Sequence, residues 1–430
     1  MKFPDLFGAR LGRWVVLGGI VATAVALQAP LPPPWPQLLA FLLIFVWPVW
    51  GWIRCLSGPV GERAVLGAAL VMALDVLLVL LLAYLPGPLV RSYQLIGQVL
   101  LASLPLFIRP EPETAVTRKA TWWPLLLLVL ITLGLRVSSL GYSEFQGDEG
   151  VIMVRAASII TGDDAELFLH QKGPVEILLP LSEWNLAGSI NEFWARLPFA
   201  WAGVWAVLAV VVLAWRWFDV GVGLLAGLLL SITGLAVAFS RIVQYQSLVM
   251  VWGTLAVLAA VRYAAGKRRT DLWLTAVFLS AGLLAHYDAI LVVPAIGWVL
   301  LQDLWRTRRF DWRAWSGAAV LGALILAIFY VPYVTNPNIG RTGRYLIQGR
   351  LGAGNGHGLL SWSGAAVWRM VTFYNSLYFA AGLILLIGAA GWHLWRRRSD
   401  LAAALLFVVP LLFYLFIVAD PRTHVYTIFP

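Results

Sequence analysis

The chain has 430 residues, of which 61% are apolar and only 12% are charged, and its mean hydropathy is +0.82. This composition excludes an ordinary soluble domain and is typical of a polytopic membrane protein. A net charge of +10 is also found in nucleic-acid-binding proteins. Here the distribution of the basic residues along the chain argues against that function. The single Cys55 excludes an intrachain disulfide.

Apolar runs long enough to cross about 30 Å of hydrocarbon recur along the whole chain. In lipid such runs must be helices, because unpaired backbone groups are too costly there. The sequence therefore predicts an all-α polytopic membrane protein. Its expected transmembrane helices, about thirteen, lie near 14–29, 37–53, 64–85, 93–108, 122–140, 197–215, 220–239, 245–264, 272–286, 288–302, 315–334, 372–394 and 401–419. We read the first run as an uncleaved span, with a cleaved signal peptide as the alternative.

The basic residues follow the expected membrane topology. With the N-terminus inside, the inner loops and ends hold 20 Lys and Arg against 9 Asp and Glu, whereas the outer segments hold 11 of each. The positive-inside rule expects this asymmetry. It explains the basic charge without nucleic acid and places the loops 141–196 and 335–362 outside the cytoplasm.

Composition divides the chain into two modules joined by a polar linker. Residues 1–109 form a four-span extension, residues 110–121 a cytoplasmic linker, and residues 122–430 the main module. Asp75 lies within the third span, where a carboxylate is either functional or bonded to a neighbouring helix.

The first outer loop, 141–196, concentrates the acidic residues. It holds nine acids against three bases, which means that the loop is either a solvated surface or a functional site. Apolar residues at helical spacing predict short amphipathic helices at Val151–Ile160 and Val175–Ala187.

Asp148 and Glu149 are the strongest candidates for chemistry in this loop. Adjacent residues on a helix diverge by about 100°, so the two carboxylates would not form a dyad. One can serve as a general base while the other supports it. The alternative is that both acids only favour a helix N-terminus.

Short segments around this acidic pair occur in an order typical of one family. The order is Leu135-Arg136, Leu140-Gly141-Tyr142, Gly147-Asp148-Glu149-Gly150, His170-Gln171-Lys172-Gly173-Pro174 and Arg196-Leu197-Pro198. In this order the chain resembles the GT-C membrane glycosyltransferases. The nearest branch is that of the dolichyl-phosphate-mannose–protein mannosyltransferases and aminoarabinose–lipid A transferases. The resemblance covers about residues 122–430 and leaves out the first four spans.

The resemblance implies an inverting glycosyltransferase with a GT-C fold, in a prokaryotic inner membrane, with its active site on the outer face. The donor would be a polyprenyl-phosphate-linked sugar and the acceptor a protein, lipid or glycan. Asp148 matches the carboxylate assigned as catalytic base in that family. Lys172 would stabilise the departing phosphate, with a surface lysine as the alternative.

Further candidates follow from polar residues at outer positions. Arg341, Arg344 and Arg350 suit phosphate oxygens, or else lie in a solvated loop. The expected cavity residues are His170, Arg241, His286, Asp288, His424 and Tyr426. The segment His286-Tyr287-Asp288 could line the donor pocket, offer metal ligands or be only a turn.

The sequence departs from the resembled branch around Lys172. Relatives often have an acid before the lysine and two prolines after it, whereas this chain has Gln171 and Gly173-Pro174. No cofactor is therefore indicated with certainty, and a divalent metal stays open. Relatives usually continue beyond the equivalent of Pro430, where another span is expected to start.

A carrier or flippase for lipid-linked sugars, without transfer chemistry, is the alternative function. A transporter is expected to show inverted repeats and polar groups at the membrane midplane. The sequence has no visible repeat, and Asp75 is the one candidate at that depth. A purely structural membrane subunit would leave Asp148 and Lys172 unexplained.

The predicted topology can be tested by cysteine labelling. In a Cys55→Ser background, cysteine at Thr161 or Ser361 is expected to react with a membrane-impermeant maleimide added outside the cell. Labelling from the cytoplasmic side alone would contradict both the orientation and the functional assignment.

Overall fold

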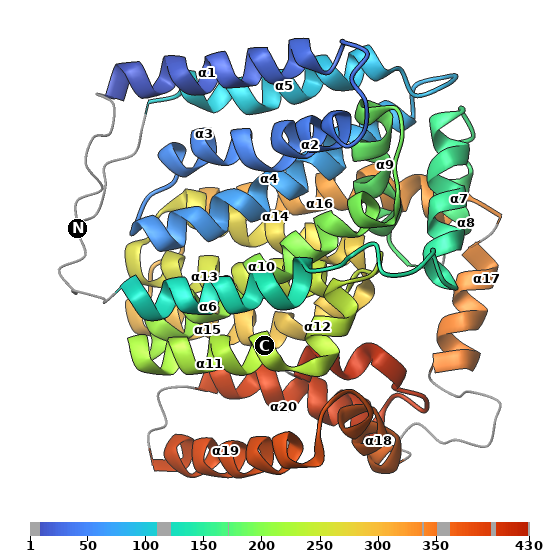
Figure 1. Cartoon of the computed structure of the whole chain (residues 1–430). Coiled ribbons are helices and arrows are strands. Elements are labelled where there is room, and N and C mark those ends of the chain that lie inside the picture. Colours follow the sequence, from blue (N-terminus) through green and yellow to red (C-terminus); the bar gives the residue numbers. More distant parts are fainter. Residues whose placement is uncertain are drawn as a thin grey trace. The chain divides into compact units, whose positions relative to one another are not determined.

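The computed structural model describes residues 9–109, 122–170, 172–337, 339–350, 362–396 and 401–428, and its regular elements in these ranges are all helices (Figure 1). The predicted all-α class is therefore confirmed. The helices group into two compact units. The first comprises Met1–Ala120, Ser139–Leu167 and Val175–Pro198, and the second comprises Thr121–Ser138, Phe168–Pro174 and Phe199–Pro430.

The first unit is built on the helix α4, most of whose residues are buried. Its helices are α1 (Ala9–Ala26), α2 (Trp35–Phe41), the π-helix η1 (Leu42–Val46), α3 (Trp47–Cys55), α4 (Val60–Ala83), α5 (Arg91–Phe107), α7 (Asp148–Ile160), α9 (Val175–Ala187) and the start of α10 (Glu192–Trp217). The four-residue helix α8 (Glu166–Leu169) lies where the chain leaves this unit.

The second unit is centred on α13 and α14. Its helices are α6 (Trp122–Val137), the rest of α10, α11 (Val220–Ile232), α12 (Gly234–Ser240), α13 (Gln246–Gly266), α14 (Arg269–Ala285), η2 (Tyr287–Val292), α15 (Val293–Thr307), α16 (Trp312–Thr335), α17 (Ile339–Arg344), η3 (Tyr345–Arg350), α18 (Gly364–Tyr374), α19 (Leu377–Arg396), α20 (Leu401–Phe416) and η5 (Arg422–Ile428). Tyr287–Thr307 forms one apolar stretch across η2 and α15.

Within the described ranges six helices are long and apolar enough to cross a membrane. A seventh candidate is the pair α11 and α12, which is bent by 64° at Thr233. The predicted count of about thirteen spans is not shown. Several predicted runs form helices of only 16 or 17 residues, such as α5, α6 and α20, below the ~20 residues that a straight span needs.

The predicted linker at 110–121 lies outside the described residues, so the module boundary there stays a prediction. By contacts, the helices of residues 1–109 group with the outer-loop segments 139–167 and 175–198. The N-terminal extension and most of the acidic loop are therefore one compact body.

The two helices predicted in the acidic loop are present, as α7 and α9. Helix α9 differs from the expected amphipathic form, because all its residues except Trp184 are buried. It packs against α2, α4, α5 and α7. Its polar side chains therefore lie inside the unit rather than at a surface.

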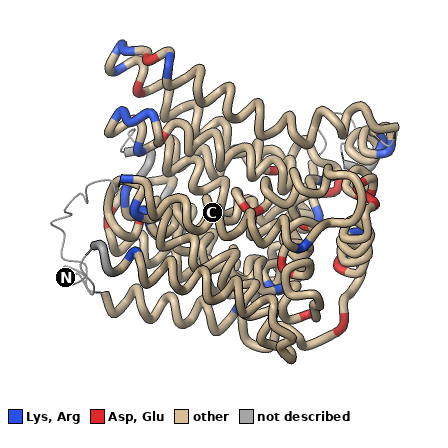
Figure 2. Tube along the Cα trace, turned by 90° about the horizontal axis from the view of Figure 1, so that it is seen from above, with Lys and Arg blue, Asp and Glu red and all other residues tan. Residues whose placement is uncertain are grey.

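Figure 2 shows the Lys, Arg, Asp and Glu residues gathered toward the ends of the helices, with few along their lengths. This is the distribution expected of helices whose middle parts lie in an apolar medium. The buried exceptions therefore need individual explanations.

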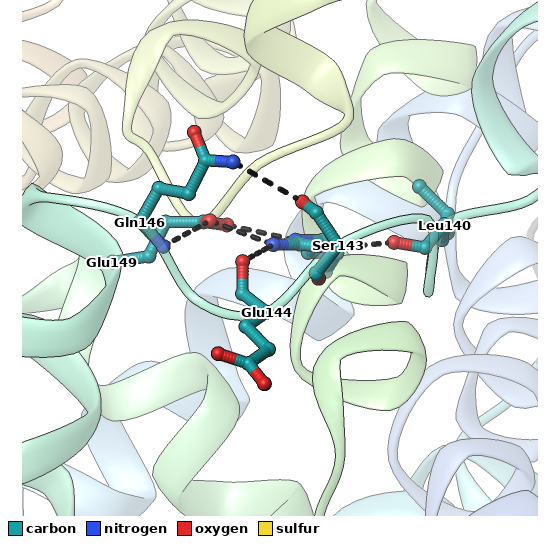
Figure 3. Close-up of polar contacts among 6 residues, drawn as sticks. Leu140, Ser143, Glu144, Gln146 and Glu149 are labelled. Carbon is teal, nitrogen blue, oxygen red and sulfur yellow. Dashed lines mark hydrogen bonds and ion pairs between the residues drawn. The ribbon is translucent and has the colours of Figure 1, made fainter.

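Arg196, in the second turn of α10, is the most fully bonded of these exceptions. Its Nε and Nη2 donate to the two carboxylate oxygens of Glu149 at 2.9 and 2.8 Å. Its Nη1 donates to the carbonyls of Leu140 (2.7 Å) and Ser143 (2.9 Å), and Nη2 also donates to the carbonyl of Glu144 (3.1 Å). A guanidinium has five N–H donors, so all are used. We call this arrangement, drawn in Figure 3, the Arg196 clamp.

The clamp fixes the turn that leads into α7. Gly147 precedes the helix with φ +47°, a conformation that favours glycine because it has no Cβ. The backbone N–H of Gln146 donates to Glu149 Oε2 at 3.3 Å, and that of Glu149 donates to the carbonyl of Gln146 at 2.9 Å. The start of α7 is therefore held by backbone and side-chain bonds together.

Removing the clamp is expected to destabilise the protein strongly. In Arg196→Ala the buried Glu149 and three carbonyls lose their donor, and breaking a buried ion pair typically costs ~3–5 kcal/mol. Arg155→Ala is the matched control, because its 3.6 Å pair with Glu166 is partly exposed and is expected to contribute under ~1 kcal/mol. Denaturation of both variants in detergent measures the difference. Equal stability of the two variants would show that the clamp does not hold this unit together.

Candidate functional site

Asp148 and Glu149 have separate surroundings. Glu149 is buried in the Arg196 clamp, whereas Asp148, the first residue of α7, is exposed. Their divergence follows from the helix, which points neighbouring side chains about 100° apart. The carboxylate of Asp148 can therefore meet a reactant from outside while Glu149 anchors the backbone beneath it.

The position of Lys172 is set by its neighbour Gly173, whose backbone lies against the backbone of Leu284 in the second unit. A Cβ on Gly173 would lie 1.6 Å from the carbonyl oxygen of Leu284, near the end of α14. Only glycine fits there, so Gly173 allows the segment to pass against the helix end. The ammonium of Lys172 then lies 4.8 Å from the centre of the Tyr245 ring, in cation–π range.

Tyr245 joins Lys172 to a buried polar cluster. Its ring stacks on that of His286, with centroids 3.9 Å apart and planes inclined by 8°. Its hydroxyl lies 3.2 Å from Nδ1 of His424. Tyr245 is only 1% exposed, so its position is fixed by packing.

The cluster itself is a chain of hydrogen bonds through Asp288. Nδ1 of His424 lies 2.6 Å from Asp288 Oδ2 and donates to it. The backbone N–H of Asp288 donates to Nδ1 of His286 at 3.1 Å. Since His286 Nδ1 accepts, the proton of this imidazole is assigned to Nε2 and the ring is neutral. The cluster therefore holds one carboxylate between two imidazoles.

These three side chains are also the described group best suited to a metal ion, with ligand atoms within 4.8 Å of one another. Two imidazoles and a carboxylate suit zinc or another divalent ion. Binding through Nδ1 of His286 would require it to give up the bond from Asp288. The present geometry is thus that of a hydrogen-bonded chain that could be converted into a metal site.

A cavity of about 20 Å³ adjoins the cluster, lined by Asp288, Tyr426, Thr254, Thr427 and apolar side chains. A space of this size holds about one water molecule and not a sugar. Burial, together with the nearby Asp288 carboxylate, raises the pKa of Tyr426 well above its ordinary value. Tyr426 is therefore a neutral hydroxyl beside the carboxylate.

The remaining predicted residues have other surroundings in the structure. His170 is buried, and Arg241 donates from Nη1 to the carbonyl of Leu135 at 2.9 Å. Arg341 and Arg344 are exposed and one turn apart on α17. Arg350 ends η3, and its side chain lies outside the described residues.

The structure thus brings together five of the predicted residues in the second unit: Lys172, His286, Asp288, His424 and Tyr426. Tyr245 was missed, because a buried tyrosine in an apolar run carries no motif. The partnership of Glu149 with Arg196 was also missed, although both residues stood in the motifs that carry the resemblance. The catalytic and binding roles of all these residues stay predictions.

Part of the chain matches a known protein family. Residues 174–339 match the model of the family described as dolichyl-phosphate-mannose-protein mannosyltransferase. The matched segment contains His286 and Asp288 but not Asp148, Lys172 or His424. No curated protein and no solved structure matches the chain.

The family match confirms the resemblance drawn from the order of the motifs. A polyprenyl-phosphate-sugar donor and a multi-pass membrane location follow from the family, whereas the acceptor and the face of the membrane do not. Residues 174–339 therefore match a domain of the dolichyl-phosphate-mannose-protein mannosyltransferases, a family of GT-C membrane glycosyltransferases, and the rest of the chain lies outside that match.

Proposed function

We propose that this glycosyltransferase moves a sugar from a polyprenyl phosphate to an acceptor at the outer face of a prokaryotic inner membrane, with inversion at the anomeric carbon. Asp148 is the general base. The observation that carries this proposal is the division of labour between the adjacent acids: Glu149 is bonded to Arg196 through both oxygens, and Asp148 is exposed at the start of α7.

The proposed step is a single displacement. The acceptor heteroatom forms a bond to the anomeric carbon while Asp148 takes its proton. The bond from that carbon to the phosphate oxygen breaks, and its electron pair leaves with the polyprenyl phosphate. A positioned base typically contributes ~10²–10⁴ in rate, which is the share assigned to Asp148.

Cationic groups are needed where negative charge develops on the departing phosphate. Lys172 is suited to this role because Tyr245 and the Gly173 approach hold its ammonium in a defined place. Arg341 and Arg344 offer two exposed guanidinium groups on one face of α17, and forked donors match phosphate oxygens. Arg350 follows them six residues later along the same segment.

The His286–Asp288–His424 chain serves this function indirectly. It fixes the ring of Tyr245 through stacking on His286 and through the contact of the Tyr245 hydroxyl with His424. Tyr245 in turn supports Lys172. These residues are therefore positioning residues for the phosphate-binding lysine.

The distribution of charged residues along the chain supports the proposal that the active site lies at the outer face of the membrane. Basic residues dominate the segments predicted to be inside, and the acidic loop with Asp148 lies in an outer segment under the same assignment. An acceptor outside the cytoplasm, whether protein, lipid or glycan, would reach Asp148 there.

Replacing the base should abolish turnover and spare donor binding. Asp148→Asn keeps the size of the side chain but cannot accept a proton at neutral pH, so transfer is expected to fall ~10²–10⁴-fold. The measurement is transfer of radiolabelled sugar from polyprenyl phosphate by purified protein, with donor binding measured in parallel.

Glu149→Gln is the matched control for that experiment. It weakens the Arg196 clamp, so it should lower stability more than Asp148→Asn while retaining part of the activity. Full activity in Asp148→Asn with loss in Glu149→Gln would exchange the two roles. Activity in both would place the base elsewhere.

Replacing the phosphate-binding cations should weaken donor binding. Each alanine variant is expected to lose ~1.5–3 kcal/mol of donor-binding free energy, or roughly ten- to a hundred-fold in donor affinity. The variants are Lys172→Ala, Arg341→Ala, Arg344→Ala and Arg350→Ala. Arg309→Ala, between α15 and α16 in a segment that the predicted topology places inside, is the control. Unchanged affinity in all four variants would leave these residues as surface charges.

Displacing Lys172 without changing it gives a second, independent test. The Cβ of Gly173→Ala would collide with the Leu284 carbonyl, so the segment must shift. Donor affinity is expected to fall by an amount similar to that in Lys172→Ala. Wild-type affinity in Gly173→Ala would show that the position of this lysine does not matter.

A further inference from the structure

The first unit contains a buried polar network outside the proposed active site. Asp75, on the apolar helix α4, is 1% exposed. Its Oδ1 accepts hydrogen bonds from Gln98 on α5 and from the hydroxyl of Ser182 on α9, the latter at 2.7 Å. Gln94 donates to the Ser182 hydroxyl (2.9 Å) and accepts from Asn185 (2.8 Å). Three helices are thus joined through side chains.

Glu183 is next to Ser182 on α9 but makes no hydrogen bond to this network within the described residues. It is completely buried, and neither of its carboxylate oxygens has a hydrogen-bond partner within the described part of the chain. The second oxygen of Asp75, Oδ2, also lacks one there. Unmade hydrogen bonds of buried groups cost ~1–3 kcal/mol each, so this arrangement needs an occupant or a proton.

The basic side chains described on the helices around α9 do not neutralise the pair. Arg91 on α5 donates to the carbonyls of Leu186 (2.8 Å) and Leu27 (2.7 Å). Arg155 on α7 pairs with Glu166 and lies in the field of Glu176, two turns before Glu183 on α9. Arg63 is twelve residues from Asp75, about 18 Å along α4.

Two neighbouring carboxyl groups in an apolar interior cannot both be ionised. Asp75 Oδ1 already accepts two hydrogen bonds, whereas Glu183 accepts none within the described residues. Burial, together with the nearby Asp75 carboxylate, raises the pKa of Glu183 well above its ordinary value. A proton on Glu183 would make it the donor that Asp75 Oδ2 lacks.

We infer that Asp75 and Glu183 form a proton-binding site, in which protonated Glu183 donates a hydrogen bond to the Asp75 carboxylate at neutral pH. The site fastens α9 to α4 and α5. Because α9 lies within the segment that matches the family model, the N-terminal helices are bonded into the family's own domain through this proton. This assignment does not rest on the proposed reaction.

The site makes the stability of the first unit depend on pH in a defined direction. The pKa of Glu183 is raised on folding, so the native state binds the proton more tightly than the unfolded chain. The stabilisation that this proton contributes is fully present below the pKa of Glu183 in the unfolded chain, about 4.3. It is lost as the pH rises through the raised pKa of the native state. Alkaline conditions should therefore loosen α9 from α4 and α5.

Glu183→Gln is the decisive variant, because glutamine keeps a neutral hydrogen-bond donor of the same shape. The infrared carbonyl band of a protonated carboxylic acid is expected in the wild type at neutral pH and should be lost in Glu183→Gln. Glu176→Gln, on the same helix beside Arg155, should retain that band. The alkaline loss of thermal stability should also be reduced in Glu183→Gln alone.

Three results would overturn the assignment. The first is a carboxylic-acid band that persists in Glu183→Gln, and the second is an unchanged pH profile in that variant. The third is stabilisation of the wild type, but not of Glu183→Gln, by sodium at constant pH and ionic strength, since the occupant would then be a metal cation. Transfer activity is not a readout here, so failure leaves the proposed reaction untouched.

Discussion

The guanidinium of Arg196 is buried with all five N–H groups bonded, and the turn that carries Asp148 depends on that saturation. An unbonded N–H in this position would cost ~1–3 kcal/mol, so the donor directions dictate where Glu149 and three carbonyls must lie. Once Glu149 is fixed inward, the helix turns Asp148 outward. The exposure of the proposed base is thus a consequence of a buried ion pair.

The same constraint, that polar groups without water must be satisfied within the protein, governs the two other buried clusters. The amides of Gln94 and Gln98 supply donors along α5, where neither lipid nor solvent could. His286, Asp288 and His424 are joined to one another by hydrogen bonds in the second unit. Helix packing here is specified by hydrogen bonds as much as by apolar contact.

Sequence periodicity predicted the bounds of α9 and all of α7 except its first three residues, because the spacing of apolar residues indicates a helix directly. It wrongly predicted that α9 is an amphipathic helix at a surface, because the hydrogen-bond partners of Ser182 and Asn185 lie about ninety residues earlier, on α5. The predicted span count is not shown, because a composition window measures apolarity and not where a helix stops. The family could be identified from the order of its motifs, whereas Tyr245, which belongs to no motif, could not.

The N-terminal helices, which lie outside the resemblance, have a physical role in holding α7. Helix α9, bonded to α4 and α5, packs along α7. At the far end of α7, the N–H of Leu89 donates to the carbonyl of Ile160 at 3.0 Å, and a Cβ on Gly162 would lie 2.9 Å from the backbone of Gly87. At its near end the Arg196 clamp fixes the start. The helix that bears Asp148 is therefore held at both ends and along its side, and two of these three supports come from residues 1–109 or depend on them.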